Sequence, residues 1–136
     1  NQVLDRDVHD NWLEFKDVCL FKADITKPFS LKNESGSNHK FDIITAWDVM
    51  EHPKPEQIPY VLENVKNHLK SDGVFLCLVN MAPCYHHQCV KPKEWWVETF
   101  NAAGLNPGDF NFNTSPRHTC YPIGPEDVGF MSRHKK

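Results

Sequence analysis

The spacing of hydrophobic residues changes twice between residues 41 and 80. Residues 41–46 are a short apolar run rich in β-branched side chains, which is typical of a strand. Across residues 58–69 the apolar positions recur at steps of three and four, so they share one face of a helix. Residues 74–79 are an unbroken apolar run, as expected of a strand that is covered on both faces. The pattern predicts a strand, a helix and a second strand.

The ends of the predicted helix also carry signals. Pro55 and Pro59 fall near its first turn, where a backbone N–H has no partner within the helix. Lys70 falls in its last turn, where a cation suits the helix dipole. Gly73 can adopt the left-handed conformation that often ends a helix.

Two buried strands joined by a crossover helix form a right-handed βαβ unit with parallel strands. The loop after the first strand, residues 47–52, then lies at the carboxyl edge of the sheet, where open α/β sheets bind their ligands. This loop contains Asp48, Glu51 and His52. We therefore expect the polar chemistry of the chain at this edge.

Three motifs of the unit resemble those of class I S-adenosylmethionine-dependent methyltransferases. In that family a hydrophobic-Asp pair lies in the fourth strand, a D-V-x-E-H-like box follows, and a helix leads to L-x-x-x-G and the fifth strand. Phe41-Asp42, DVMEH at 48–52 and LKSDG at 69–73 match in order and spacing. The resemblance covers roughly residues 17–133, and its specific part is 41–80. It implies a Rossmann-like α/β sheet, a methyltransferase activity and S-adenosylmethionine as the cofactor.

Further elements are expected on both sides of this unit. They are a helical stripe at 3–12, a strand at 17–24, a polar surface connection at 26–40, a helix between Pro92 and Gly104, and strands at 110–114 and 128–132 that pair antiparallel. A strand pair at the end of the sheet is what the resemblance implies.

The glycine-rich loop of the family, G-x-G-x-G after its first strand, has no counterpart in the sequence. By resemblance the strand at 17–24 is the third of seven in the order 3-2-1-4-5-7-6. The chain is therefore expected to be a single incomplete domain, residues 1–136, which lacks the first two strands. Either the enzyme is truncated, or a second chain supplies the missing N-terminal half.

The resemblance also assigns cofactor-binding residues. It implies that the carboxylate of Asp24 accepts a hydrogen bond from the adenine amino group, with Ile25 beside the ring and Trp47 flanking the adenine or methionine part. The alternatives are that Asp24 only caps the next turn, and that Trp47 only packs.

His52 and His87 are the candidate catalytic residues. Methyl transfer from a sulfonium is an in-line displacement, in which positioning of the nucleophile supplies much of the rate. An oxygen or nitrogen nucleophile can also need a base, and a histidine supplies one near neutral pH. The alternative is that Glu51 and His52 satisfy a helix N-terminus before Pro53.

Two patterns suggest a metal ion, and the sequence argues against both. Cys84-Tyr85-His86-His87-Gln88-Cys89 contains zinc's preferred ligands, but within six residues they cannot easily form one tetrahedron. The loop at 80–91, with Trp95 and Trp96 behind it, is expected to form the substrate wall instead.

The second pattern combines Asp48, Glu51 and His52 with His86 or His87. It resembles the metal-dependent RNA 3′-terminal methyltransferases, whose E-x-x-E-H box and later histidine bind a divalent ion. Asp at the first position and the absence of a basic groove count against that alternative. We therefore expect no metal and no nucleic acid.

Composition narrows the class of protein. The net charge of −3 lacks the basic excess of nucleic-acid-binding proteins, and no apolar stretch reaches the ~20 residues that span a bilayer. The five cysteines are scattered, which indicates reduced thiols and a cytoplasmic protein. The sequence thus predicts methyl transfer to a small-molecule oxygen or nitrogen acceptor. The competing prediction is a non-catalytic methyltransferase-like binding or regulatory module.

Overall fold

The computed structural model describes residues 19–110 and 127–136 of the chain. Its elements are β1 (Phe41–Trp47), η1 (Pro55–Gln57), α2 (Ile58–His68), β2 (Leu69–Val79), α3 (Lys93–Ala102), β3 (Leu105–Asp109) and β4 (Val128–His134). The helical stripe expected at 3–12 lies outside the described residues. None of the described helices is long and apolar enough to cross a membrane.

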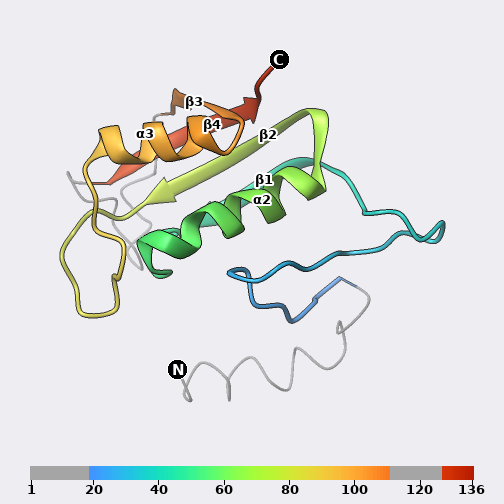
Figure 1. Ribbon diagram of the computed structural model, residues 1–136, viewed down its shortest axis with the longest axis horizontal. Helices are drawn as coiled ribbons and strands as arrows, with labels where there is room; N and C mark the ends of the chain where they lie inside the picture. Colours follow the sequence, from blue (N-terminus) through green and yellow to red (C-terminus); the bar gives the residue numbers. More distant parts are fainter. Residues whose placement is uncertain (1–18, 111–126) are drawn as a thin grey trace, which may run out of the picture.

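The described strands form one mixed sheet in the order β1-β2-β4-β3. β1 and β2 are parallel, whereas β4 is antiparallel to both β2 and β3. Figure 1 shows α2 and α3 on the same face of this sheet. The βαβ unit expected from the hydrophobic spacing is therefore confirmed, as is the α/β fold class.

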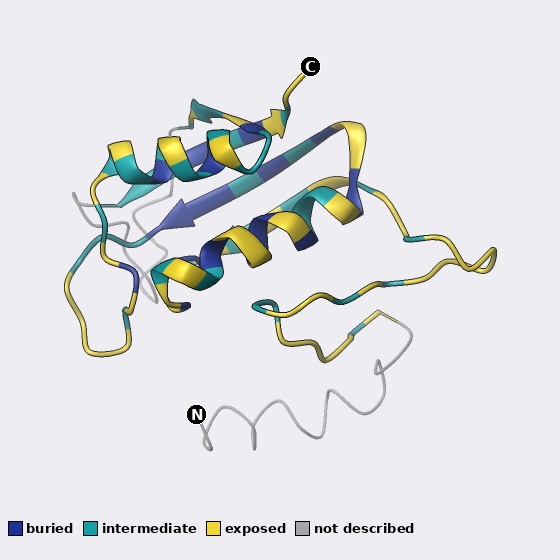
Figure 2. Cartoon of the chain, viewed as in Figure 1, coloured by how far each residue is buried: buried dark blue, intermediate teal, exposed yellow. Residues whose placement is uncertain are grey.

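The core lies between the two helices and the sheet. α2 contributes Ile58, Val61 and Leu62, and α3 contributes Trp96 and Phe100, all of them buried (Figure 2). The Phe100 ring packs on two strands at once, with its centroid 6.1 Å from that of Phe75 in β2 and 5.3 Å from that of Phe130 in β4. Each such side chain contributes about 1.5–3 kcal/mol of burial free energy.

The ends of the helices differ in part from expectation. Pro55 opens η1 and Pro59 lies in the first turn of α2, as predicted. However, α2 ends at His68, and Leu69 is already extended because it pairs with Phe41 at the start of β2. Gly73 is therefore inside β2 and not left-handed, which corrects the prediction.

The second helix follows the sequence pattern closely. α3 is flanked by Pro92, which precedes its first residue, and by Gly104, which has the left-handed φ of 86°. Gly104 N–H donates to Asn101 O, so the glycine closes the helix and turns the chain into β3.

Two strand predictions need correction. A strand was expected at 17–24, but residues 21–24 belong to no strand, and residues 17–18 lie outside the described part. The physical reason is that a strand is stable only where a neighbouring strand pairs with it. The described partner of β4 is residues 105–109, and Phe110 N–H also donates to Gly129 O, whereas residues 111–114 of the expected strand lie outside the described part. The sequence pattern did not predict the strand at 105–109 because it contains Pro107 and Gly108, which are rare within strands. A proline is tolerated there because β3 is an edge strand of the described sheet.

The connection between residues 25 and 31 is fixed to α2. Asn64 donates through Nδ2 to the carbonyls of Ile25 and Lys27, and Leu31 N–H donates to His68 Nε2. An apolar cavity of about 350 Å³ lies between this connection, β1 and α2. The connection therefore runs beside β1 without adding a strand to it.

Candidate active site

The site begins where β1 ends. Asp48 has a positive φ of 50°, which is unusual for a residue other than glycine, and its N–H donates to Leu78 O on β2. This left-handed residue turns the chain away from the sheet immediately after Trp47. It thereby places residues 49–52 across the carboxyl edge of β1.

A second loop, residues 80–91, follows β2 and meets the first. Since β1 and β2 are parallel neighbours, their carboxyl ends lie at the same edge of the sheet. Cys89 N–H donates to Glu51 O at 3.0 Å, and Gln88 Nε2 donates to His52 O at 2.9 Å. These two hydrogen bonds hold the loops together.

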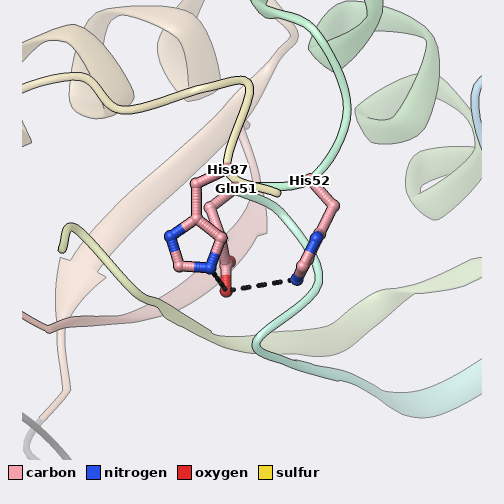
Figure 3. Close-up of side chains that lie close together, drawn as sticks. All are labelled: Glu51, His52 and His87. Atoms are coloured by element: carbon pink, nitrogen blue, oxygen red, sulfur yellow. Dashed lines mark ion pairs between the residues drawn. The ribbon is translucent and has the colours of Figure 1, made fainter. Parts of the chain in front are cut away.

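The two loops bring one carboxylate and two imidazoles together (Figure 3). Glu51 Oε1 lies 3.8 Å from His52 Nε2 and 4.0 Å from His87 Nε2. The imidazole rings meet edge to face, with centroids 5.1 Å apart. The candidate bases predicted from the sequence thus share a single carboxylate.

Glu51 is fully buried, and neither of its carboxylate oxygens has a hydrogen-bond partner in the described part of the chain. Burial raises the pKa of Glu51, and the charge of Asp48 raises it further. The backbone N–H groups of Glu51 itself and of Asn80 partly oppose the rise without meeting hydrogen-bond geometry. Burial likewise raises the pKa of Asp48, and Asp127 adds to that rise.

The capping interpretation of Glu51 is wrong. The N–H of Lys54, before η1, donates to Gln57 Oε1, and the Glu51 carboxylate meets no helix N-terminus. A buried carboxylate without such a partner is costly, and this cost is typical of a functional group and not of a structural cap.

The ring of His87 is oriented by a hydrogen bond to a backbone carbonyl of its own loop. Its Nδ1 lies 2.8 Å from the carbonyl oxygen of Ala82, which can only accept, so Nδ1 carries a proton and Nε2 presents a lone pair to Glu51 in the neutral ring. The neighbouring His86 is exposed and packs on Tyr85 instead. The sequence had His87 as a catalytic candidate and left His86 and His87 open only in the metal pattern, and it is His87 that lies beside Glu51.

The cofactor candidates lie at the end of the preceding segment and at the end of β1. Thr26 donates to Asp24 Oδ1 through both its N–H and its hydroxyl, which realises the turn expected as the alternative role and lowers the pKa of Asp24. Its second oxygen, Oδ2, is 3.9 Å from Lys27 Nζ and remains accessible. Ile25 lines the apolar cavity beside Ala46.

Trp47, at the end of β1, exposes 48 % of its surface. An ionised carboxylate with one accessible oxygen, an apolar side chain and an exposed aromatic ring fit the adenine end of S-adenosylmethionine. No contact described in the structure assigns the roles of these three residues, which remain predictions.

The cysteines of the 80–91 loop do not join the cluster. Cys84 is exposed, whereas Cys89 is buried and its thiol pKa is raised to about 11 by burial. Among the described residues, the group of potential metal ligands that gathers within 4.8 Å is Glu51, His52 and His87. The sequence grouped Glu51 with His52 and His86 or His87 only in a metal pattern that it argued against, and it did not predict Glu51 as the common partner of the two candidate bases.

Comparisons with known proteins agree with this fold. A family model described as "Methyltransferase domain" matches residues 4–116. No curated protein matches the sequence significantly. The chain is similar to a solved S-adenosylmethionine-dependent methyltransferase from Clostridium acetobutylicum, with a TM-score of 0.67 and 13 % identity. The match covers 100 % of this chain and 73 % of the other.

Two further solved structures share the fold. A TehB-like methyltransferase from Corynebacterium glutamicum has a TM-score of 0.58 and 17 % identity over 83 % of this chain and 54 % of its own. A 1,6-didemethyltoxoflavin-N1-methyltransferase from Burkholderia thailandensis, solved with that compound and S-adenosylhomocysteine bound, has a TM-score of 0.59 and 17 % identity over 96 % and 56 %. The chain thus spans little more than half of these two relatives.

The family match covers most of the chain, and the βαβ unit with its DVMEH loop is where the sequence resemblance placed it. The chain therefore belongs to the class I S-adenosylmethionine-dependent methyltransferase family.

Proposed function

We propose that the protein transfers a methyl group from S-adenosylmethionine to an oxygen or nitrogen atom of a small molecule, and that the loops at 48–52 and 80–91 receive the acceptor. The observation that carries the proposal is the buried Glu51 carboxylate facing two histidines at the carboxyl edge of the sheet. When bound, the cofactor supplies an electrophilic methyl group.

The chain's own residues would orient the acceptor and remove its proton. The side chain of His52 is half exposed, so an acceptor would approach its ring from solvent. The Glu51 carboxylate beside both Nε2 atoms stabilises the imidazolium that forms when either ring takes a proton. Asp24, Ile25 and Trp47 would hold the adenine end of the cofactor.

The test measures S-adenosylhomocysteine formed by the complete protein with a panel of small hydroxyl- and amine-bearing molecules. His52→Ala should lower turnover by roughly 100-fold with unchanged cofactor affinity, since general acid–base catalysis contributes about that much. His86→Ala is the matched control, because His86 is an exposed neighbour outside the cluster. We expect it to leave turnover unchanged.

The same experiment addresses the competing module. A complete protein that binds S-adenosylmethionine but forms no product with any acceptor would favour a binding or regulatory role. Equal turnover of the native protein and His52→Ala would remove His52 from catalysis.

A further inference from the structure

The cluster of Glu51, His52 and His87 has the composition of a metal site. One oxygen and two imidazole nitrogens, which come from two different loops, lie within 4.8 Å of one another. A carboxylate and two histidines are the protein ligands of one class of catalytic zinc site. Loop-to-loop hydrogen bonds at Gln88 and Cys89 fix the spacing of the three groups.

The hydrogen bonds of the cluster leave a gap that a cation fits. His87 gives its Nδ1 proton to Ala82 O, so a neutral His87 faces Glu51 Oε1 with a lone pair. Two acceptors then oppose each other at 4.0 Å, and the carboxylate has no other partner in the described part of the chain. Such an arrangement is unfavourable unless a positive charge lies between the two atoms.

A proton is too small to fill this gap. A direct hydrogen bond would bring the nitrogen and oxygen to about 2.7–3.2 Å, whereas the two separations are 3.8 and 4.0 Å. Bonds of about 2.1 Å to a tetrahedral ion place neighbouring ligand atoms about 3.4 Å apart. The two distances from Glu51 Oε1 exceed this value by a few tenths of an ångström, and all three ligand atoms lie within 4.8 Å of one another, so the half-exposed His52 and His87 would move inward to complete that geometry.

The Ala82 contact supplies a second feature of metal sites. Histidine ligands usually donate their other ring N–H to a carbonyl or carboxylate, which fixes the ring and its tautomer. His87 makes this contact at 2.8 Å, and the adjacent His86 does not take its place. The Cys84 and Cys89 thiols of the same loop stay outside the cluster.

We propose that Glu51, His52 and His87 bind one divalent transition-metal ion, with zinc the first candidate, and that the ion keeps a coordination position open toward solvent on the side of His52. This differs from the expectation of no metal drawn from the sequence. Together with the proposed function, it implies an acceptor whose reacting oxygen or nitrogen can itself bind the ion. In the metal-bound protein His52 and His87 would act as ligands, so the base role described under the proposed function belongs to the metal-free protein.

The binding test is separate from methyl transfer. The complete protein is stripped with a chelator and titrated with Zn²⁺ alone against a chromophoric competitor. We expect one zinc per chain, and a loss of affinity for His52→Ala and His87→Ala that exceeds the roughly 10- to 100-fold loss typical of removing an outer-shell partner. His86→Ala is the control and should bind like the native protein.

A second variant and a second readout guard against misfolding. Glu51→Gln keeps the buried shape but removes the anionic ligand, and circular dichroism reports whether each variant is folded. With Co²⁺ in place of zinc, the native protein and His86→Ala should show visible absorption of low-coordinate cobalt, and the ligand variants should lose it. The proposal would be overturned if the native protein bound no zinc, or if folded His52→Ala and His87→Ala bound zinc as tightly as the native protein, whatever the methyl-transfer assay shows.

Discussion

At the scale of single residues, the site depends on positions where the local rules of folding are broken. Asp48 has a left-handed backbone without being glycine, and Glu51 is a buried carboxylate without a hydrogen bond in the described part of the chain. Both features cost free energy, and they occur three residues apart at the ligand-binding edge of the sheet. Their coincidence supports a site that is built for chemistry and not for stability.

Asp24 has one oxygen that accepts from Thr26 and one that remains accessible, and this permits a clean test of its predicted cofactor role. Asp24→Ala in the complete protein should weaken S-adenosylmethionine binding by about 1–3 kcal/mol, the cost of leaving a polar partner unpaired. Thr26→Ala is the control, because it removes a donor to Oδ1 and leaves the carboxylate in place. Calorimetry that gave equal affinities for Asp24→Ala and the native protein would leave Asp24 only its turn.

Cys77 predicts how stability depends on alkaline pH. Its thiol is fully buried, and burial raises its pKa above the ordinary 9.0, with the charge of Glu51 adding to the rise. The folded state therefore holds this proton more tightly than the unfolded state. The contribution of this thiol to stability is unaffected below pH 9 and falls above it, by up to about 1.4 kcal/mol per pH unit.

Denaturant unfolding between pH 8 and 10.5 measures this slope. Cys77→Ala should be less stable throughout but should lose stability less steeply above pH 9. Cys84→Ala, at an exposed cysteine, should keep the native slope. Identical slopes for the native protein and Cys77→Ala would show that the thiol does not report on folding.

At the scale of elements, hydrophobic spacing located the central unit but not every boundary in it. A helical period and continuous apolar runs predicted α2 (Ile58–His68), β1 (Phe41–Trp47) and β2, although β2 begins at Leu69 and not at residue 74 as expected. The strand at 105–109 could not be found in this way, since LNPGD has no alternation and contains proline and glycine. Its pairing with β4 is a tertiary effect, which a local pattern does not contain.

The site was predictable to the same depth. The loop at 48–52 could be placed at the sheet edge because the order of strand, helix and strand determines which ends meet. The approach of His87 to Glu51 could not, because it depends on a long-range contact between loops 80–91 and 48–52. The sequence already had His87 as a catalytic candidate, but the contact that orients its ring, at the Ala82 carbonyl, is visible only in the structure.

The end of α3 offers a prediction at this scale. Gly104 has a φ of 86°, and a Cβ built there would lie 3.2 Å from Lys66 Nζ, the flexible end of a side chain. Backbone strain is therefore the main term, and Gly104→Ala should lower the free energy of unfolding by about 1–2 kcal/mol. Gly104→Asn should lose less, because asparagine tolerates this conformation better.

Urea unfolding of both variants decides the point. A loss for Gly104→Asn as large as that for Gly104→Ala would assign the effect to crowding at Lys66. No loss in either variant would mean that the helix ends in another conformation.

At the scale of the whole molecule, one face of the sheet is not covered by a described helix and exposes apolar side chains of β1. Both described helices lie on the other face, and β1 has a neighbour on one edge only within residues 19–110 and 127–136. Ile43 exposes 60 % and Trp47 exposes 48 % of its surface, although alternate β1 residues Ile44 and Ala46 pack against the core. Solved relatives of the fold are longer than this chain. We therefore expect further polypeptide to cover Ile43 in a longer form of the protein.

Ile43→Lys tests this expectation in two backgrounds. In residues 1–136 expressed alone, β1 is an edge strand with an exposed apolar side chain at Ile43, and such strands promote aggregation. The added charge of lysine should therefore raise solubility without lowering the melting temperature. In a longer form that covers β1, the same lysine would lose its hydration, and the melting temperature should fall by several degrees. Ile44→Lys, one residue along on the packed face, should destabilise the protein in both backgrounds. If Ile43→Lys strongly destabilised residues 1–136 alone, Ile43 would already be covered within this chain, and the expectation that further polypeptide covers it would be wrong.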